Sequence, residues 1–186
     1  YTGETVVTPY SLQISSDGAE AYMVNYTNGR VYQYTMGTAW TPSTATYTGY
    51  VSLAPASGCK SIYIHSDGTK MYAQGGASLY QFTLSTPWDI TTATYDNISV
   101  NQALQTGTLY FSSDGKMLYA YTGYGLRQFE LNTPWDITIA KYSGVVGAMY
   151  YKADIHEAGI FAATSTTVKT YSAETNPHVF TRHGIQ

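Results

Sequence analysis

Short runs of alternating hydrophobic and polar residues recur along the chain, and glycine, proline, asparagine or aspartate separates them. The clearest set covers residues 61–64, 70–73, 79–84 and 94–100, which are rich in Tyr, Ile, Val and Thr. Successive side chains of a strand point to opposite faces, so this alternation predicts half-buried β-strands. The pattern therefore predicts four short strands, and Asp-Gly at 67–68 predicts a tight two-residue turn between the first two.

The same set of runs repeats along the chain. Three Asp-Gly turns lie 50 and 47 residues apart and anchor the repeat: Asp17-Gly18, Asp67-Gly68 and Asp114-Gly115. Each is followed by a strand tyrosine that we expect in the core: Tyr22, Tyr72 and Tyr119. Each repeat then has a loop tryptophan that we expect to fill the gap between neighbouring repeats: Trp40, Trp88 and Trp135. The repeats cover about 10–55, 60–100, 107–147 and, in degenerate form, 148–186.

Four antiparallel strands repeated every 40–50 residues are typical of a β-propeller blade. We therefore expect an all-β fold, a single propeller domain over 1–186 with four four-stranded blades. Residues 1–8 align with the last strand of the first repeat, so we expect them to complete the last blade, which otherwise holds three strands. Three alternatives stay open: half of a ring made by two subunits, an excerpt of a longer propeller, or a fibre in which residues 1–8 enter a neighbouring chain.

Composition narrows the classes of function. Only 11% of the residues are charged, the net charge is −3, and 20 residues are tyrosine. Without a basic surface the chain is not expected to bind nucleic acid. It has no apolar run of about 18 residues, so no membrane insertion is expected. Its single cysteine, Cys59, excludes an internal disulfide framework and a cysteine-based zinc site.

The chain carries none of the catalytic motifs that we sought. It has neither a Gly-x-Ser-x-Gly elbow nor a phosphate-binding loop, and its four histidines fall at unrelated positions of the repeat. The Asp-Gly turns lack the additional oxygen ligands of a calcium loop. The expectation is therefore a protein that is not an enzyme, with no catalytic residue, no metal and no cofactor.

The loops that join the second strand to the third, and one repeat to the next, differ between repeats. Variable loops on a rigid scaffold are where binding sites are expected. Tyrosine beside asparagine and glutamine gives an adaptable recognition surface of low charge. The candidate ligand-binding residues are Tyr26, Asn28, Gln74, Gln102, Tyr121 and Tyr124.

The segment SSDGKMLYAYTGYGLRQFELNTPWDITIAKY, residues 112–142, resembles a repeat of bacterial and bacteriophage propeller proteins. Such repeats carry Ser-x-Asp-Gly and then Pro-Trp-Asp-Ile, as in tail-associated and fibre-type phage proteins and bacterial surface proteins. The resemblance covers residues 10–142 well and the fourth repeat weakly, and the first repeat departs with Ala39-Trp40-Thr41-Pro42. More distantly, the first two strands are similar to surface-layer and lactonase-like propellers. The resemblance implies a virion, extracellular or cell-surface location.

Together these features favour a non-enzymatic structural or adhesive module of a virion or extracellular appendage. The expected partners are further copies of the chain, other appendage proteins, or surface glycans. A carbohydrate-binding lectin is the first alternative. A lactonase-like enzyme is the second, and it would need converging acids and a metal that the sequence does not display.

Overall fold

The computed structural model describes residues 9–56, 58–101, 109–122, 125–147, 153–156, 159–163, 168–173 and 180–183. Side chains are described up to residue 144, with 121–122 excepted. The chain divides into two compact units, Tyr1–Gly107 and Thr108–Gln186.

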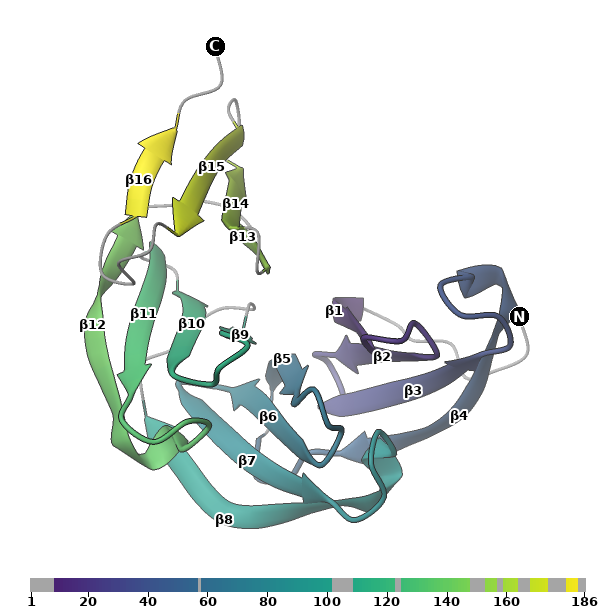
Figure 1. Ribbon diagram of the computed structural model, residues 1–186. Coiled ribbons are helices and arrows are strands. Elements are labelled where there is room, and N and C mark those ends of the chain that lie inside the picture. Colours follow the sequence, from purple (N-terminus) through teal and green to yellow (C-terminus); the bar gives the residue numbers. More distant parts are fainter. Residues whose placement is uncertain are drawn as a thin grey trace. The chain divides into compact units, whose positions relative to one another are not determined.

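The first unit contains two four-stranded antiparallel sheets (Figure 1). Sheet 1 has the order β1-β2-β3-β4, with strands Pro9–Ile14, Glu20–Asn25, Arg30–Met36 and Ala45–Ser52. Sheet 2 repeats this order as β5-β6-β7-β8, with strands Cys59–Ile64, Lys70–Gly75, Ser78–Leu84 and Ala93–Asn101. The predicted strands and their antiparallel pairing are therefore confirmed.

The second unit contains two more sheets of the same kind within its described residues. Sheet 3 is built from β9 (Leu109–Phe111), β10 (Met117–Thr122), β11 (Gly125–Leu131) and β12 (Ala140–Gly147). Sheet 4 is built from β13 (Ala153–His156), β14 (Gly159–Ala163), β15 (Val168–Ala173) and β16 (Phe180–His183).

Sheet 4 corrects one expectation. The sequence predicted three strands for it and assigned the fourth place to residues 1–8. Instead, β16 pairs with β15, Ala173 opposite Phe180, so the chain's own C-terminal segment takes that place. The degenerate sequence after residue 173 hid this strand. Residues 1–8 themselves lie outside the described residues.

In sheets 1, 2 and 3 the turn before the second strand is longer than the predicted two-residue hairpin. In sheet 1 it runs over residues 15–19: the Gly18 N–H donates to the Ser15 carbonyl at 2.9 Å, and the Ala19 N–H donates to Asp17 Oδ1 at 2.9 Å. Gly18 is left-handed, with φ 74°. The aspartate thus holds an Asx-type turn, and the glycine supplies the positive φ.

The loop tryptophans lie on these turn glycines. The backbone N–H of each tryptophan donates to the carbonyl of a turn glycine. The distances are 2.9 Å for Trp40 to Gly18, 3.0 Å for Trp88 to Gly68 and 2.9 Å for Trp135 to Gly115. A Cβ on any of these glycines would lie within 2.2–2.5 Å of the indole. The indole therefore covers a turn of its own sheet, a contact that the sequence did not predict. Trp88 also packs at the edge of the core between sheets 1 and 2.

A short 3-10 turn follows each tryptophan: η1 (Pro42–Thr44), η2 (Ile90–Thr92) and η3 (Ile137–Ile139). Asp89 begins η2 by accepting the Thr91 N–H at 3.0 Å, and Asp136 begins η3 by accepting the Thr138 N–H at 2.9 Å. Each aspartate thus caps the first turn of its short helix. The turn aims Ile90 and Ile137, both fully buried, into the core.

The core of the first unit lies between sheets 1 and 2. Sheet 1 contributes Tyr22, Val24 and Val31, and sheet 2 contributes the opposing residues, among them Ile62, Ile64, Met71, Phe82 and Ile90. The strand tyrosines Tyr22, Tyr72 and Tyr119 are all buried, as predicted. Tightly packed apolar side chains of this kind are the main source of stability in such a fold.

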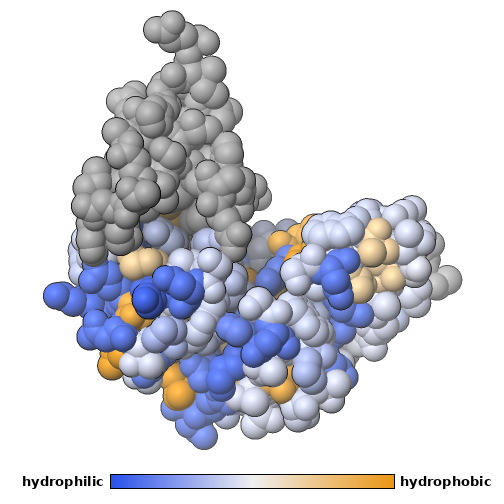
Figure 2. Space-filling view, in the orientation of Figure 1, coloured by the Kyte–Doolittle hydropathy of each residue, from blue (hydrophilic) through white to orange (hydrophobic). Residues whose placement is uncertain are grey.

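The other face of sheet 1 is also apolar. The strand register places Leu12 opposite Met23, and Ile14 opposite Ala21, and opposed residues share a face. The equivalent residue of Leu12 in sheet 2 is Ile62, which is 6% exposed because sheet 1 covers it, whereas Leu12 is 60% exposed. Hydrophobic side chains are visible over β1 in Figure 2. Sheet 1 thus exposes at Leu12 the same apolar face that sheet 2 buries at Ile62.

Candidate functional site

A polar hollow lies where sheet 1 meets the tryptophan loop of sheet 2. Its volume is about 310 Å³, and its lining includes Glu20, Thr35, Thr48, Trp88, Asp89 and Thr91. Sheet 1 supplies the first three from β2, β3 and β4, and the loop between β7 and β8 supplies the others. Two carboxylates, three hydroxyls and an indole therefore meet in one concave place.

The strand register explains the sheet 1 side of this hollow. Glu20 lies opposite Thr35 in the ladder, and Gln33 lies opposite Tyr22, so all four side chains share the face toward sheet 2. Glu20 Oε2 accepts from Gln33 Nε2 at 2.9 Å, and Glu20 Oε1 accepts from Thr35 Oγ1 at 2.9 Å. The carboxylate is thus held by donors on the neighbouring strand.

Gln33 joins the two sheets through its amide. Its Nε2 donates to the Trp88 carbonyl at 3.0 Å, and its Oε1 accepts the buried Ile90 N–H at 3.0 Å. The Tyr22 hydroxyl donates to the same Trp88 carbonyl at 2.8 Å. These bonds fix the loop that carries Trp88 and Asp89 against sheet 1.

The electrostatics of the hollow are acidic. Burial raises the pKa of Tyr22 well above its usual value, and the nearby carboxylates of Glu20, Asp17 and Asp89 raise it further. Tyr22 therefore stays neutral and serves as a hydrogen-bond donor. The described lining holds two carboxylates and no cationic side chain.

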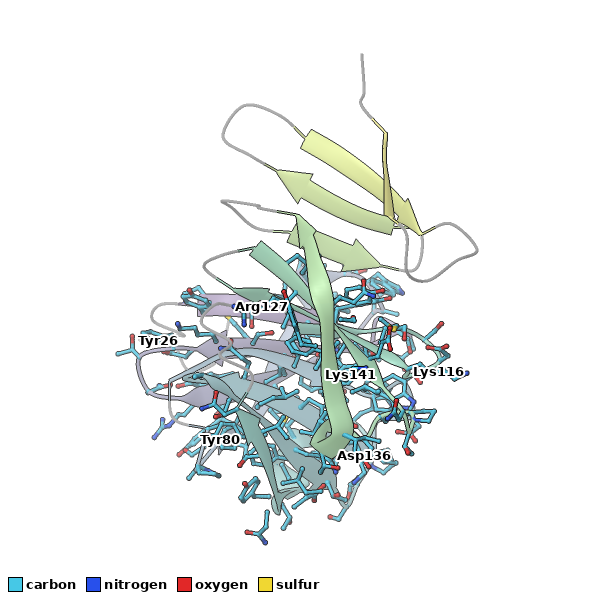
Figure 3. All side chains as sticks on the ribbon, turned by 90° about the vertical axis from the view of Figure 1, so that its left-hand side faces the viewer. Tyr26, Tyr80, Lys116, Arg127, Asp136 and Lys141 are labelled. Atoms are coloured by element: carbon cyan, nitrogen blue, oxygen red, sulfur yellow. The ribbon has the colours of Figure 1, made fainter. Side chains whose placement is uncertain are left out.

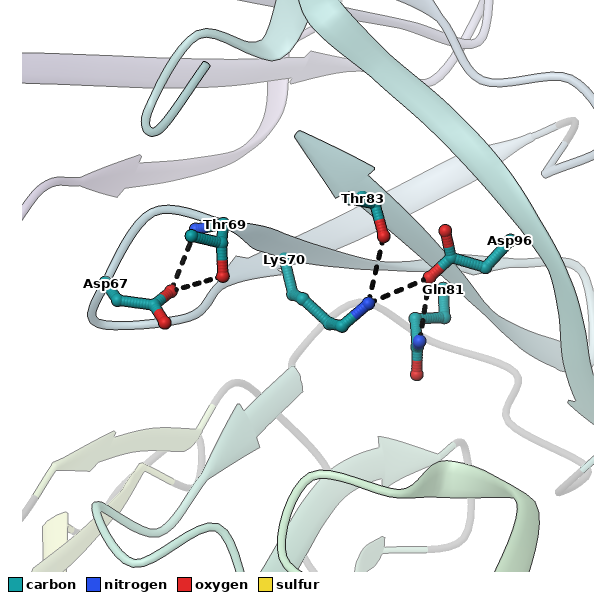
Figure 4. A network of polar contacts seen from close by, with 6 residues as sticks. All are labelled: Asp67, Thr69, Lys70, Gln81, Thr83 and Asp96. Atoms are coloured by element: carbon teal, nitrogen blue, oxygen red, sulfur yellow. Dashed lines mark hydrogen bonds and ion pairs between the residues drawn. The ribbon is translucent and has the colours of Figure 1, made fainter. Parts of the chain in front are cut away.

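The equivalent place in sheet 2 has different chemistry (Figure 4). Lys70 replaces Glu20 there, Gln81 matches Gln33, and Asp96 matches Thr48. Lys70 Nζ donates to Thr83 Oγ1 at 2.9 Å and pairs with Asp96 at 3.2 Å, and Gln81 Nε2 donates to Asp96 Oδ2 at 2.8 Å. Burial raises the pKa of Asp96, but the bonds from Gln81, Thr83 and Lys70 outweigh it and lower the pKa overall. Because the Lys70 ammonium balances the charge of the Asp96 carboxylate, this place lacks the net negative charge of the hollow at Glu20.

No sequence motif marks this hollow. Glu20 and Asp89 come from different repeats, and their meeting depends on how one sheet packs on the next. A usable signal existed: at a position that is otherwise regular in the repeat, the three copies carry Glu20, Lys70 and Met117. Such a change of charge at an equivalent position marks a place where the repeats differ in chemistry.

The predicted loop residues are only partly brought together. Tyr26 and Asn28 line a second hollow at the β2–β3 turn. Gln74 is buried and donates to the Gly76 carbonyl at 3.0 Å, which makes it a turn residue. Tyr121 lies in β10 with only its backbone described, and Gln102 and Tyr124 lie outside the described residues.

Two further features are absent from the described residues. No group of three or more His, Cys, Asp or Glu side chains is placed to hold a metal ion in that part of the chain. Within the same residues, no helix is long and apolar enough to cross a membrane.

Solved structures similar to this chain include proteins named as lactonases and a β-propeller domain. No protein-family profile and no curated protein match the chain. A putative 6-phosphogluconolactonase from Bacteroides fragilis is 16% identical, with a TM-score of 0.65 over 94% of this chain and 53% of its own. The periplasmic gluconolactonase of Pseudomonas aeruginosa is 14% identical, with a TM-score of 0.61 over 96% and 53%. The β-propeller domain of Cps50 (Swd1) from Myceliophteria thermophila is 13% identical, with a TM-score of 0.53 over 87% and 52%.

The chain spans about half the length of these solved proteins. The likeness contradicts the prediction of a non-enzymatic structural or adhesive virion module, because the similar structures include proteins named as lactonases. The lactonase-like alternative now has the better support. The location and the partners stay predictions. The four-stranded antiparallel sheets and their likenesses identify the fold as all-β, of the propeller type.

Proposed function

We propose that this chain binds a neutral sugar lactone in the hollow at Glu20 and Asp89 and promotes its hydrolysis. The observation that carries the proposal is the convergence of two carboxylates, three threonine hydroxyls and the Trp88 indole in about 310 Å³. A cleft with a few converging polar groups is the usual form of a small-molecule site. One of the similar solved structures is named a gluconolactonase and two are named putative 6-phosphogluconolactonases, which fits a sugar lactone as the ligand class.

The charge of the hollow narrows the ligand. A phosphorylated sugar carries negative charge and would be repelled by Glu20 and Asp89, with no cationic lining residue described to offset it. A neutral lactone instead offers hydroxyl groups that donate to carboxylates and accept from threonines. The ligand is therefore an unphosphorylated lactone.

The reaction requires a base and a proton donor. Glu20 takes a proton from a water molecule, and the resulting hydroxide adds to the lactone carbonyl carbon. The ring carbon–oxygen bond then breaks, and the proton held by Glu20 passes to the departing alkoxide. The product is the open-chain hydroxy acid, and Glu20 returns to its carboxylate form.

A second candidate is sugar binding without hydrolysis. It is favoured by the bonds that Glu20 accepts from Gln33 and Thr35, since they also suit a carboxylate that only orients a ligand. Binding without turnover would distinguish this candidate from the first.

The experiment follows glucono-δ-lactone hydrolysis by acid release at constant pH, against the buffer rate. We expect acceleration by the protein and its loss in Glu20→Gln. Asp96→Asn is the matched control, because it removes the carboxylate of the equivalent network in sheet 2, and it should keep the rate. No acceleration by the parent protein, or equal rates for Glu20→Gln and the parent, would overturn hydrolysis at this hollow.

We also propose that the four sheets are the blades of a closed propeller, in which a blade covers the Leu12 face of sheet 1. The supporting contrast is the exposure of Leu12 (60%) against that of Ile62 (6%). Leu12→Cys should then react more slowly with a thiol reagent than Ser16→Cys, which lies in the exposed turn of the same sheet. Equal rates would contradict closure over this face.

A further inference from the structure

A second hollow of about 610 Å³ lies at the other end of sheet 1. It opens between the β2–β3 turn and the β4–β5 connection, and its lining includes Tyr26, Asn28, Gly29, Ser52, Leu53 and Gly58. None of its described lining residues also lines the hollow at Glu20. The two hollows are therefore separate places on the first unit.

The β2–β3 turn is held by asparagine side chains. Asn25 Oδ1 accepts the Thr27 N–H at 3.0 Å. Asn28 Nδ2 donates to the Tyr32 hydroxyl at 2.8 Å, and Asn28 Oδ1 accepts the Arg30 N–H at 3.1 Å. Because both ends of the Asn28 amide are engaged, its position in the hollow is fixed before any ligand arrives, which lowers the entropic cost of binding.

Two glycines border the hollow. Gly29 and Gly58 are both left-handed, with φ 64° and 65°, and a Cβ on Gly29 would lie 3.9 Å from the Gly58 nitrogen. A Cβ on Gly58 would lie 3.7 Å from Tyr26 Cε2. The absence of side chains at these two positions keeps the space beside the Tyr26 ring open.

Tyr26 forms an aromatic wall. It is 45% exposed and projects from the end of its hairpin (Figure 3). The Tyr10 ring lies 5.5 Å from it between centroids, and Lys60 Nζ lies 5.6 Å from its centroid. These neighbours orient the ring, so a large apolar surface remains at the mouth of a hollow that also carries amide and hydroxyl groups.

We infer that this second hollow binds a neutral sugar ring. The described lining combines an aromatic ring, the aliphatic Leu53, and the polar Asn28 and Ser52, and it holds no charged side chain. A pyranose has the matching character: its C–H face packs on an aromatic ring, and its hydroxyls exchange hydrogen bonds with amides and hydroxyls. A charged ligand would find no partner of opposite sign among these lining residues, and the nearby Lys60 ammonium already lies over the Tyr26 ring.

The inference does not depend on the proposed lactone reaction. It places sugar recognition at a second site, where attachment to a glycan would not consume the ligand. The two sites can be inactivated separately, so the failure of one proposal leaves the other intact.

The test uses the full chain and three probes: the methyl glycosides of glucose, galactose and mannose. Binding is measured by saturation-transfer difference NMR and titration. We expect at least one glycoside to bind, Tyr26→Ala to weaken it about tenfold, and Tyr26→Phe to preserve it, because stacking uses the ring and not the hydroxyl. Tyr50→Ala is the matched control, since Tyr50 is 40% exposed on the same sheet and does not line the hollow.

Four results decide the matter. Equal loss in Tyr26→Ala and Tyr50→Ala, or no binding of any glycoside by the parent, would overturn the inference. Binding that is lost in Glu20→Gln and kept in Tyr26→Ala would assign the sugar to the first hollow and overturn it as well. Loss in Tyr26→Ala with unchanged lactone hydrolysis would support it.

Discussion

The indole of Trp88 lies against Gly68, and both residues have left-handed backbones, with φ 67° and 73°. The backbone N–H of Trp88 donates to the Gly68 carbonyl at 3.0 Å, which joins the loop after β7 to the turn before β6. A non-glycine residue with positive φ is uncommon and costs free energy. The same arrangement at Trp40 and Trp135 shows that the contact compensates for this cost in three sheets.

We predict that Gly68→Ala destabilises the protein. The new Cβ would lie 2.5 Å from the Trp88 indole, so the ring must move, and the alanine must also hold a left-handed backbone. The expected loss is about 3 kcal/mol in the free energy of unfolding, from steric displacement and backbone strain together. Urea unfolding followed by tryptophan fluorescence measures it.

Gly76→Ala is the matched control for this loss. Gly76 is also left-handed, with φ 57°, but a Cβ there would meet nothing within 4 Å. Only the backbone cost of about 1 kcal/mol is expected. If the two variants lose the same stability, the indole contact contributes nothing.

A second prediction concerns Gln33, which joins sheets 1 and 2. Gln33→Leu removes the partner of the buried Ile90 N–H and one donor to the Trp88 carbonyl. Leaving a buried N–H unpaired costs about 1–3 kcal/mol. Thr48→Val, which removes one bond to the Gln33 carbonyl, should cost less. Chemical unfolding compares the two, and a stability of Gln33→Leu equal to that of the parent would contradict this role.

The thiol of Cys59 should be unreactive in the native protein. Burial raises its pKa to about 12, so the thiolate is scarce at neutral pH. We expect Ellman's reagent to label Cys59 only after unfolding in urea. A cysteine at Ser16, in the exposed turn of sheet 1, should be labelled at once. Rapid labelling of Cys59 in the folded parent would show that this part of the core opens.

Acid should weaken the turn at Asp67. Burial raises the pKa of Asp67, but the Thr69 N–H, the Thr69 hydroxyl and His65 outweigh it and lower the pKa from 3.8 to about 2. The folded state therefore binds this proton less readily than the unfolded state. The resulting stability is present above pH 3.8 and is lost as the pH falls toward 2.

The measurement compares Asp67→Asn with the parent protein across this range. The variant should be the less stable protein at pH 5, and the difference should shrink as the pH falls to 2. It should be small throughout, because the Asp67 side chain is 55% exposed and solvent screens its contacts. A difference that stays constant with pH would show that the carboxylate's charge is not involved.

Local pattern predicted the strands well, because alternation and turn residues act over a few positions. Each Asp-Gly turn and its following buried tyrosine could be identified from neighbouring residues alone. The Trp88–Gly68 contact could not, because it joins positions twenty residues apart through a left-handed backbone that the sequence does not display. Strand β16 was missed because the fourth repeat has lost the residues that mark its end.

The candidate site was hidden for a different reason. Glu20 and Asp89 lie in separate repeats, and the packing of sheet 1 on sheet 2 brings them to one hollow. Tyr26 and Asn28 were grouped from the sequence because both lie in one turn, where sequence neighbours are also neighbours in space. The residues of one loop can thus be grouped from the sequence, whereas a hollow between sheets requires the register and packing.

The tryptophan–glycine contact closes within a single repeat, for both partners belong to the same four strands. Gaining or losing a whole repeat would leave the tryptophan–glycine contact of every remaining repeat complete. An array with this property can change its number of modules by duplication or deletion of gene segments without breaking the turns that survive. Its evolution is then constrained by the side chains between modules, such as Gln33, which must form hydrogen bonds with the backbone of the next module.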